Sequence, residues 1–255
     1  ICACLVGSEM CIRDRYKIIN LMIIKHFNTS ILKGDFMITE ENIIYTTTLI
    51  KAYNYEKNIC NTGTGFFCKD EENYYLISNK HIVDGCTEFE FKVPMYGDDK
   101  IVTTKIKIDP SSHSLYDIGV IGINAVMSSN YKYNIKFIEI SDFYNDQLFK
   151  CSNIENIIML GYPQGMKGDP LGCPIIKSGI TATPISKKYN DQEIFLTDIL
   201  SFPGSSGSPI FIKYNDSYIL VGIHYASATT IDDGSHIGLG FCIKDSILYN
   251  WIKGI

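Results

Sequence analysis

Short apolar runs separated by polar and turn-forming residues make up most of the chain from residue 37 onward, and long runs with helical spacing are rare. This pattern is typical of a β-sandwich or a β-barrel, so we expect an all-β fold. The predicted strands of a first half cover residues 43–53, 64–68, 74–78, 87–93 and 101–108. Those of a second half cover residues 157–161, 175–182, 194–196, 208–212, 218–225 and 238–243.

The end of the chain has a different spacing. Its apolar residues lie on one face of a helix, which predicts a short C-terminal helix: Ile247, Leu248, Trp251 and Ile252. The polar cluster at residues 69–73 is expected to be a hairpin loop between two strands of the first half.

Composition places the chain among globular proteins, with 255 residues, 45% hydrophobic and 20% charged. At this length roughly 70% of the surface of the unfolded chain can be buried, so a core can form without disulfides or a structural metal. The nine cysteines follow no metal-ligand spacing and no evident paired framework. We therefore expect free thiols and no metal site.

The first 36 residues are predicted to be a non-native or disordered leader. Residues 1–15 contain EMCIRDR, which a transposase end sequence used in preparing sequencing libraries would encode. Residues 33–36 can be encoded by a ribosome-binding sequence just ahead of Met37, where we expect the native protein to begin; a short N-terminal arm is the alternative. From Met37 onward, 18 Lys and Arg face 25 Asp and Glu, because residues 1–36 hold five basic and three acidic residues.

This acidic balance leaves no basic surface of the kind that nucleic-acid binding requires. The residues after Met37 have neither the pattern of a signal peptide nor that of a membrane span. The sequence therefore predicts a cytoplasmic protein with no nucleic-acid or membrane partner, and it leaves the oligomeric state open.

The strongest motif for chemistry is FPGSSGSP at residues 202–209, in which glycines flank a serine just before an apolar strand. Glycines let backbone N–H groups approach a substrate closely. The N–H groups of Gly204 and Ser206 are candidates for holding an oxyanion, and the Ser206 hydroxyl is a candidate nucleophile that would need a base nearby. An ordinary Gly/Ser turn in a β protein is the alternative.

Two upstream segments could supply that base and its partner. An apolar strand is predicted to run straight into His81 and to end there, and Asp117 immediately precedes another apolar run, where a carboxylate could fix the histidine tautomer. Three further aspartates are alternatives to Asp117 but lie in evident turns: Asp84, Asp99 and Asp109.

The order His, Asp, Ser, with GTGFF ahead of the histidine and GSSGSP at the serine, resembles the trypsin-like peptidase superfamily. Residues 197–209 and the GLGF segment at 238–241 are similar to bacterial HtrA-type proteases, and the resemblance covers residues 46–252 without a PDZ domain. It implies two antiparallel Greek-key β-barrels of the chymotrypsin type, predicted at residues 37–142 and 143–255. It also implies a catalytic triad of His81, Asp117 and Ser206, with no cofactor.

Substrate preference is predicted from the strand that should line the specificity pocket, where candidate substrate-binding residues are His224, Tyr225 and Ala226. His224 resembles the histidine of glutamyl endopeptidases, which also have a hydroxyl at the position of Ser201. Leu200 stands where trypsin has an acid, which disfavours cleavage after Lys or Arg. A half-buried strand histidine without a binding role is the alternative for His224.

Taken together, these features predict a serine endopeptidase that acts on protein or peptide substrates and prefers Glu, Gln or small residues before the cut. Its rival is a catalytically silent peptide-binding module on the same fold, because a fold does not guarantee a function.

Overall fold

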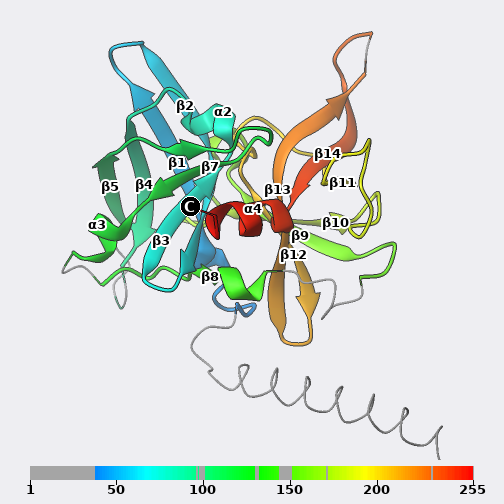
Figure 1. Ribbon diagram of the computed structural model, residues 1–255, viewed down its shortest axis with the longest axis horizontal. Helices are drawn as coiled ribbons and strands as arrows, with labels where there is room; N and C mark the ends of the chain where they lie inside the picture. Colours follow the sequence, from blue (N-terminus) through cyan, green and yellow to red (C-terminus); the bar gives the residue numbers. More distant parts are fainter. Residues whose placement is uncertain are drawn as a thin grey trace, which may run out of the picture. The chain divides into compact units, whose positions relative to one another are not determined.

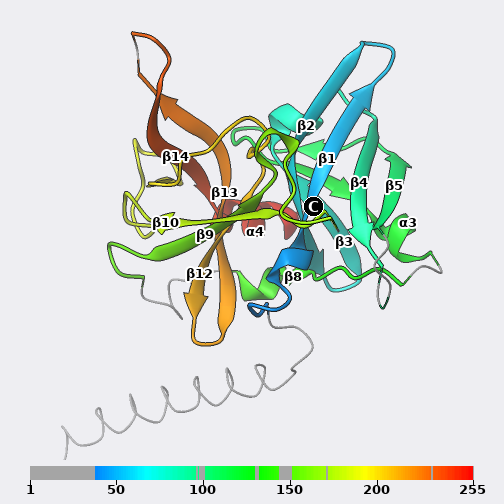
Figure 2. The same cartoon turned by 180° about the vertical axis from the view of Figure 1, so that it is seen from behind.

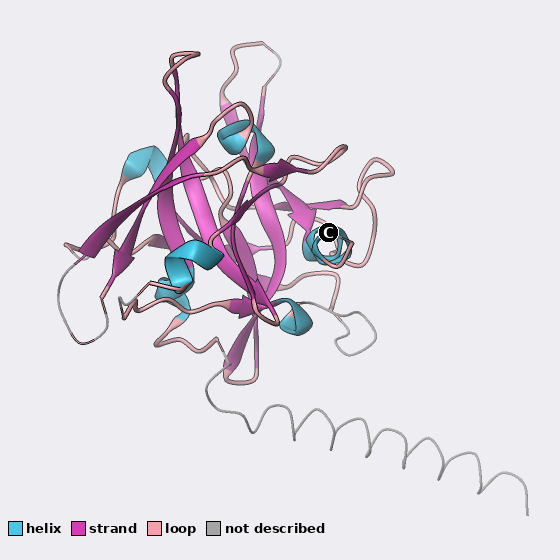
Figure 3. Ribbon diagram, turned by 60° about the vertical axis from the view of Figure 1, so that its left-hand side comes forward, coloured by secondary structure: helices cyan, strands magenta, loops and turns pink. Residues whose placement is uncertain are grey.

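The computed structural model describes residues 38–95, 97, 101–129, 132–143, 151–170, 172–230 and 232–254. The predictions for residues 1–36 and for Met37 lie outside these residues. Strands predominate in the described part of the chain, as Figure 3 shows. None of the helices found there has the length and apolar character that a membrane span requires.

The first half of the fold is a sheet of eight strands. Its path is β5-β4-β1-β2-β3-β7-β6, with β8 pairing in parallel with β2 and all other pairs antiparallel. The strands are β1 (Thr47–Asn54), β2 (Ile59–Asp70), β3 (Asn73–Ser78), β4 (Glu88–Pro94), β5 (Ile101–Lys107), β6 (Ser111–Ser112), β7 (Gly119–Gly122) and β8 (Ile138–Glu139). The helical turns are η1 (Ile43–Thr46), α2 (Lys80–Val83), α3 (Asn124–Met127) and η2 (Ile140–Asp142).

The second half is an antiparallel sheet of six strands in the order β10-β9-β12-β13-β14-β11. The strands are β9 (Asn156–Gly161), β10 (Ile175–Ile180), β11 (Ile194–Thr197), β12 (Pro209–Tyr214), β13 (Ser217–Thr229) and β14 (His236–Lys244). A 3-10 turn, η3 (Pro163–Gly165), follows β9, and helix α4 (Asp245–Ile252) follows β14. Figure 1 shows the two sheets next to each other with α4 across the space between them.

The outermost strands of each sheet are linked to each other. In the second half, a bridge between Thr181 and Thr197 joins the ends of the two outermost strands, β10 and β11. In the first half, the outermost strands β5 and β6 are consecutive in the chain and are separated only by residues 108–110. The predicted all-β fold with two barrels and a short C-terminal helix is therefore confirmed.

Two groups of buried side chains hold the barrels together. One fills the interior of the first barrel and includes Ile50, Leu76 and Phe91. The other is shared by both halves, since Ile77 of β3 and Phe211 of β12 belong to it together with buried residues of α4. Burial of a large apolar side chain contributes about 1.5–3 kcal/mol, so this shared core fixes one barrel against the other. Figure 2 shows the same arrangement from behind, where β1 of one barrel faces β9 of the other.

Three local predictions differ from the structure. The predicted strand at residues 43–53 begins with the 3-10 turn η1, so β1 starts only at Thr47. His81 lies in the short helix α2 and not at the end of a strand. The turn of the predicted 69–73 loop is confined to Glu71 and Glu72, because Asp70 and Asn73 still pair as strand residues. The split of the chain at residues 142 and 143 stays a prediction, since the chain from Ile38 onward forms one compact unit.

Candidate active site

His81 and Asp117 meet because of the way β3 and β7 pair. Ser78 at the end of β3 is opposite Gly119 at the start of β7, so the residues just outside both strands come close together. The Asp117 Oδ1 atom accepts a hydrogen bond from the His81 backbone N–H at 2.9 Å, and Oδ2 lies 2.6 Å from His81 Nδ1. One carboxylate thus fixes both the backbone and the ring of the histidine, which leaves ring nitrogen Nε2 for another partner.

Asn79 holds the aspartate from behind, a role that the sequence alone did not indicate. Its Nδ2 donates to the Asp117 backbone carbonyl at 2.7 Å, and the side chain is fully buried. A buried amide with a fixed partner keeps the loop of Asp117 in place. Asn61 of β2 likewise donates to the backbone carbonyl of Ile82, the residue after the histidine, at 3.1 Å.

The other candidate aspartates do not reach the histidine. Asp84 accepts a hydrogen bond from the Ser112 hydroxyl and pairs with Lys80 at 3.8 Å. Asp109 is exposed and has no hydrogen bond to His81, and Asp99 lies outside the described residues.

The serine loop that precedes β12 needs glycine at two positions. Gly204 has a φ of +93° and Gly207 a φ of +87°, a region that side chains with a Cβ rarely adopt. A Cβ on Gly204 would also lie 2.5 Å from the Tyr162 carbonyl oxygen, and one on Gly207 would lie 2.0 Å from that of Thr64. The glycines of the motif therefore allow a tight loop that packs closely against the backbone of Tyr162 and Thr64.

Thr64 of β2 ties this loop to the first barrel. Its backbone N–H donates to the Ser206 carbonyl at 2.8 Å, and its hydroxyl donates to the Gly204 carbonyl at 2.8 Å while accepting from the Tyr162 N–H at 3.0 Å. Sequence analysis missed this residue, because partners about 100 or more positions away leave no local signal.

Gly63 of β2 lies next to both the histidine segment and the serine loop. A Cβ on Gly63 would lie 2.9 Å from the Ile82 side chain and 3.1 Å from the Ser206 carbonyl oxygen, so both flank the same point of β2. Among the described residues, no hydrogen bond joins His81 to the Ser206 hydroxyl. Catalytic hydrogen bonds are often long in ligand-free structures and tighten when substrate binds.

The backbone N–H groups of Gly204 and Ser206 point to no acceptor within the described part of the chain, whereas the neighbouring N–H groups do: that of Ser205 donates to Phe202 and that of Gly207 to His224. Unpaired N–H groups on a tight glycine loop are the donors that an oxyanion site requires.

The candidate specificity residues are Ser201, just before the serine loop, and three residues of β13. Ser201 is 1% exposed, and its hydroxyl forms a hydrogen bond with that of Ser227 on β13. His224 is 3% exposed, and a β-bulge between His224 and Ala226 changes the register of β13 against β14. Tyr225 packs instead against Phe241 of β14. Ser227, which directly follows the GIHYA segment, is a partner of Ser201 that the sequence did not indicate.

The imidazole of His224 is held neutral. Burial, followed by the nearby charges of Lys177 and His81, lowers the pKa of His224 from 6.5 to about 4. Gly240 of β14 makes room for this ring, since a Cβ there would lie 3.1 Å from His224 Nδ1.

This shift predicts a pH dependence of stability. The unfolded chain takes up the His224 proton near pH 6.5 and the folded chain only near pH 4, so the stabilisation is complete above pH 6.5 and is lost as the pH falls towards 4. Across that range we expect the free energy of unfolding to fall by on the order of 3 kcal/mol through this group. We measure the free energy of unfolding in urea at several pH values and plot it against pH. The slope of this plot should be flatter for His224→Gln than for the wild type. The exposed His236 offers the control, and equal slopes for His224→Gln and His236→Gln would contradict the assignment.

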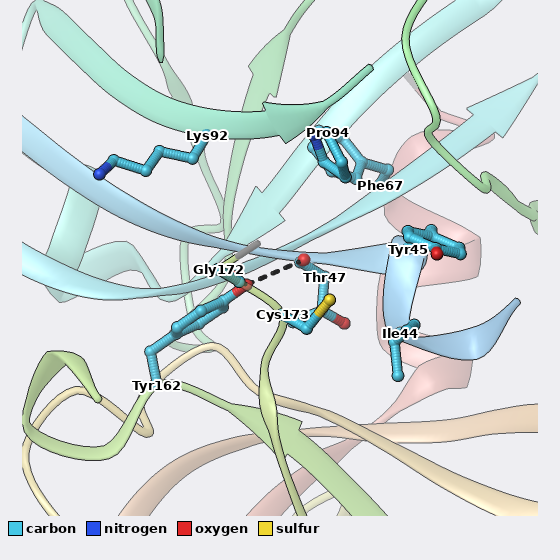
Figure 4. A pocket seen from close by; sticks show the side chains of 9 residues that line it. All are labelled: Ile44, Tyr45, Thr47, Phe67, Lys92, Pro94, Tyr162, Gly172 and Cys173. Atoms are coloured by element: carbon cyan, nitrogen blue, oxygen red, sulfur yellow. Dashed lines mark hydrogen bonds between the residues drawn. The ribbon is translucent and has the colours of Figure 1, made fainter. Parts of the chain in front are cut away.

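No cluster of three or more His, Cys, Asp or Glu side chains that could hold a metal occurs among the described residues. The cysteines of the described ranges are free thiols. Figure 4 shows a small hollow elsewhere, between η1, β4 and the loop after η3, lined in part by Thr47, Lys92 and Cys173. Tyr162 also lines this hollow, and its hydroxyl donates a hydrogen bond to the carbonyl of Gly172 at 2.9 Å. This hydroxyl therefore already has a partner.

Comparisons with solved structures show the same fold. The chain is similar in fold to the serine endoprotease from Yersinia pestis (16% identity, 83% of this chain and 62% of that chain, TM-score 0.53). It is also similar to the HtrA-type protease AlgW with tripeptide (15% identity, 84% and 61%, TM-score 0.57). A third similar structure is the MamO protease domain from Magnetospirillum magneticum in its apo form (13% identity, 82% and 97%, TM-score 0.55).

At these identities the likeness establishes the fold, and the chain spans about three fifths of the length of the first two proteins. No curated protein matches the chain. The model of the trypsin-like peptidase domain, however, matches residues 63–223, well over half of the sequence, and this match covers the histidine, the aspartate and the serine loop. The chain therefore belongs to the trypsin-like peptidase domain family.

Proposed function

We propose that the protein is a serine endopeptidase with Ser206 as nucleophile, His81 as general base and Asp117 as the residue that orients His81. The observation that carries this proposal is the contact of 2.6 Å between Asp117 Oδ2 and His81 Nδ1 in a member of this family. It leaves Nε2 as the ring nitrogen that can take up the Ser206 proton.

In the proposed reaction, Ser206 Oγ attacks the carbonyl carbon of the scissile bond as its proton passes to His81 Nε2. The N–H groups of Gly204 and Ser206, which have no acceptor within the described residues, stabilise the negative charge on the substrate oxygen. His81 then returns the proton to the leaving amine, and water releases the acyl group by the same steps in reverse.

The proposed pocket for the residue before the cut is lined by Ser201, Ser227 and His224, with the backbone near Ala226 alongside. The ring of His224 makes no hydrogen bond to any described residue, which favours a role in binding over that of a histidine satisfied within its strand. Two hydroxyls and a neutral imidazole can hydrogen-bond a Glu carboxylate or a Gln amide. Leu200 offers no negative charge for Lys or Arg.

The test is cleavage of a peptide library by the purified chain. We expect hydrolysis of internal peptide bonds, with Glu and Gln enriched before the cut, as read by mass spectrometry of the fragments. Hydrolysis without this enrichment would contradict the specificity role of His224 and Ser201 but would support the endopeptidase activity. Peptide binding without hydrolysis would instead support the rival function, a silent binding module on the same fold.

A further inference from the structure

Lys177 of β10 lies at the edge of the proposed pocket, although no sequence motif indicates that position. Its ammonium donates a hydrogen bond to the Leu200 carbonyl, directly before Ser201. It also lies 5.5 Å from the centroid of the Phe202 ring, directly after Ser201. The ammonium therefore lies next to both residues that adjoin Ser201 in the chain.

The backbone explains this position. β10 runs beside the segment that leads from β11 to the serine loop, since the Ile180 N–H donates to Asp198 Oδ1 at 2.6 Å and the Asp198 N–H donates to the Ile180 carbonyl at 3.2 Å. Gly179 allows the close approach, because a Cβ there would lie 2.7 Å from Ile199. Lys177 is thus carried on a sheet strand and not on a free loop.

Among the described residues, no Asp or Glu forms an ion pair with Lys177, and its side chain is partly buried. Burial lowers the pKa of Lys177, and the charge of Lys177 contributes to the lowered pKa of the buried His224. An anion beside this ammonium would add a charge-assisted hydrogen bond to the contacts that it already makes with the Leu200 carbonyl and the Phe202 ring.

The three residues that line the proposed pocket supply no positive charge. A Glu side chain buried against Ser201, Ser227 and neutral His224 would receive hydrogen bonds but no positive charge from these three residues, and an unpaired buried carboxylate is costly. The Lys177 ammonium has three N–H donors and uses one on Leu200, so donors remain for a carboxylate.

We propose that Lys177 is the specificity-determining cation of this pocket, pairing with the carboxylate of an acidic residue before the cut and so favouring Glu over the isosteric Gln. The proposal deepens the proposed function, on which it rests for the location of the pocket. The alternative role for Lys177 is only to tie β10 to the loop at Leu200.

The test compares two peptides that differ only in Glu or Gln before the cut. For Lys177→Met we expect the ratio of kcat/KM for the Glu peptide to that for the Gln peptide to fall about 10-fold or more, because hydrogen bonds to charged groups are worth more than neutral ones. Lys177→Arg, which keeps the charge, should retain most of the ratio. Lys187→Met makes the same change at an exposed position of the same barrel and should leave the ratio unchanged.

A measurement of peptide binding tests the role of Lys177 without relying on turnover. The affinities of both peptides are also measured by calorimetry on chains inactivated by Ser206→Ala, with and without Lys177→Met. A fall in the Glu/Gln affinity ratio supports the proposal even if the chain hydrolyses nothing, in which case only the proposed function fails. An affinity ratio that is the same for Lys177→Met and Lys187→Met, in chains whose thermal melting is unchanged, overturns it.

Discussion

Replacement of Ser206 by alanine should lower kcat by up to about 10⁶-fold, the loss seen when a triad nucleophile is removed. The Ser206 hydroxyl makes no hydrogen bond to another described residue, so its loss breaks no internal contact. The loop stays anchored by its backbone, because the Thr64 N–H still donates to the carbonyl of residue 206. We therefore expect an inactive chain whose thermal stability is close to that of the wild type.

The measurement combines hydrolysis of a chromogenic peptide, labelling by a fluorophosphonate probe and thermal denaturation. Ser208→Ala is the matched control, since it is the same change two residues further on, at a buried hydroxyl with no hydrogen-bond partner among the described residues. This control should keep labelling and turnover. Undiminished labelling of the Ser206→Ala variant would show that the nucleophile is another residue.

The strands could be predicted from sequence because their signals are local. The apolar runs of β3 and β9 and the alternation of apolar and polar residues in β4 are typical of strands, and turn residues mark their ends. The local prediction failed at Ile43, where the apolar run begins with a 3-10 turn. It also failed at His81, where the chain turns into a short helix. Both errors lie at element ends, where the competing conformations differ little in free energy.

The candidate site could be predicted only in part. The glycines around Ser206 left a signal, because their positive φ angles demand that residue type in the chain itself. Thr64, Asn79 and Lys177 left none, because a threonine, an asparagine and a lysine are common in strands and loops. Their roles come from contacts with residues 23 to 140 positions away, which depend on how the barrels close.

Asp117→Asn should lower kcat by about 10⁴-fold while the fold is retained. Both carboxylate oxygens are acceptors here: Oδ1 receives the His81 N–H and Oδ2 faces Nδ1. An asparagine has one oxygen and one NH₂ group. If its oxygen keeps the bond to the His81 N–H, its NH₂ group faces Nδ1 and forces that nitrogen to accept. The ring proton then moves to Nε2, and the imidazole can no longer take the proton of Ser206.

The backbone of residue 117 would remain in place, because Asn79 Nδ2 donates to its carbonyl and not to its side chain. The loss should therefore appear in kcat for a peptide substrate, with little change in the free energy of unfolding measured in urea. Asp84→Asn is the control from the same neighbourhood, since Asp84 binds Ser112 and Lys80 and forms no hydrogen bond or ion pair with His81. If Asp117→Asn and Asp84→Asn had similar kcat values, the carboxylate that orients His81 would have to be sought elsewhere.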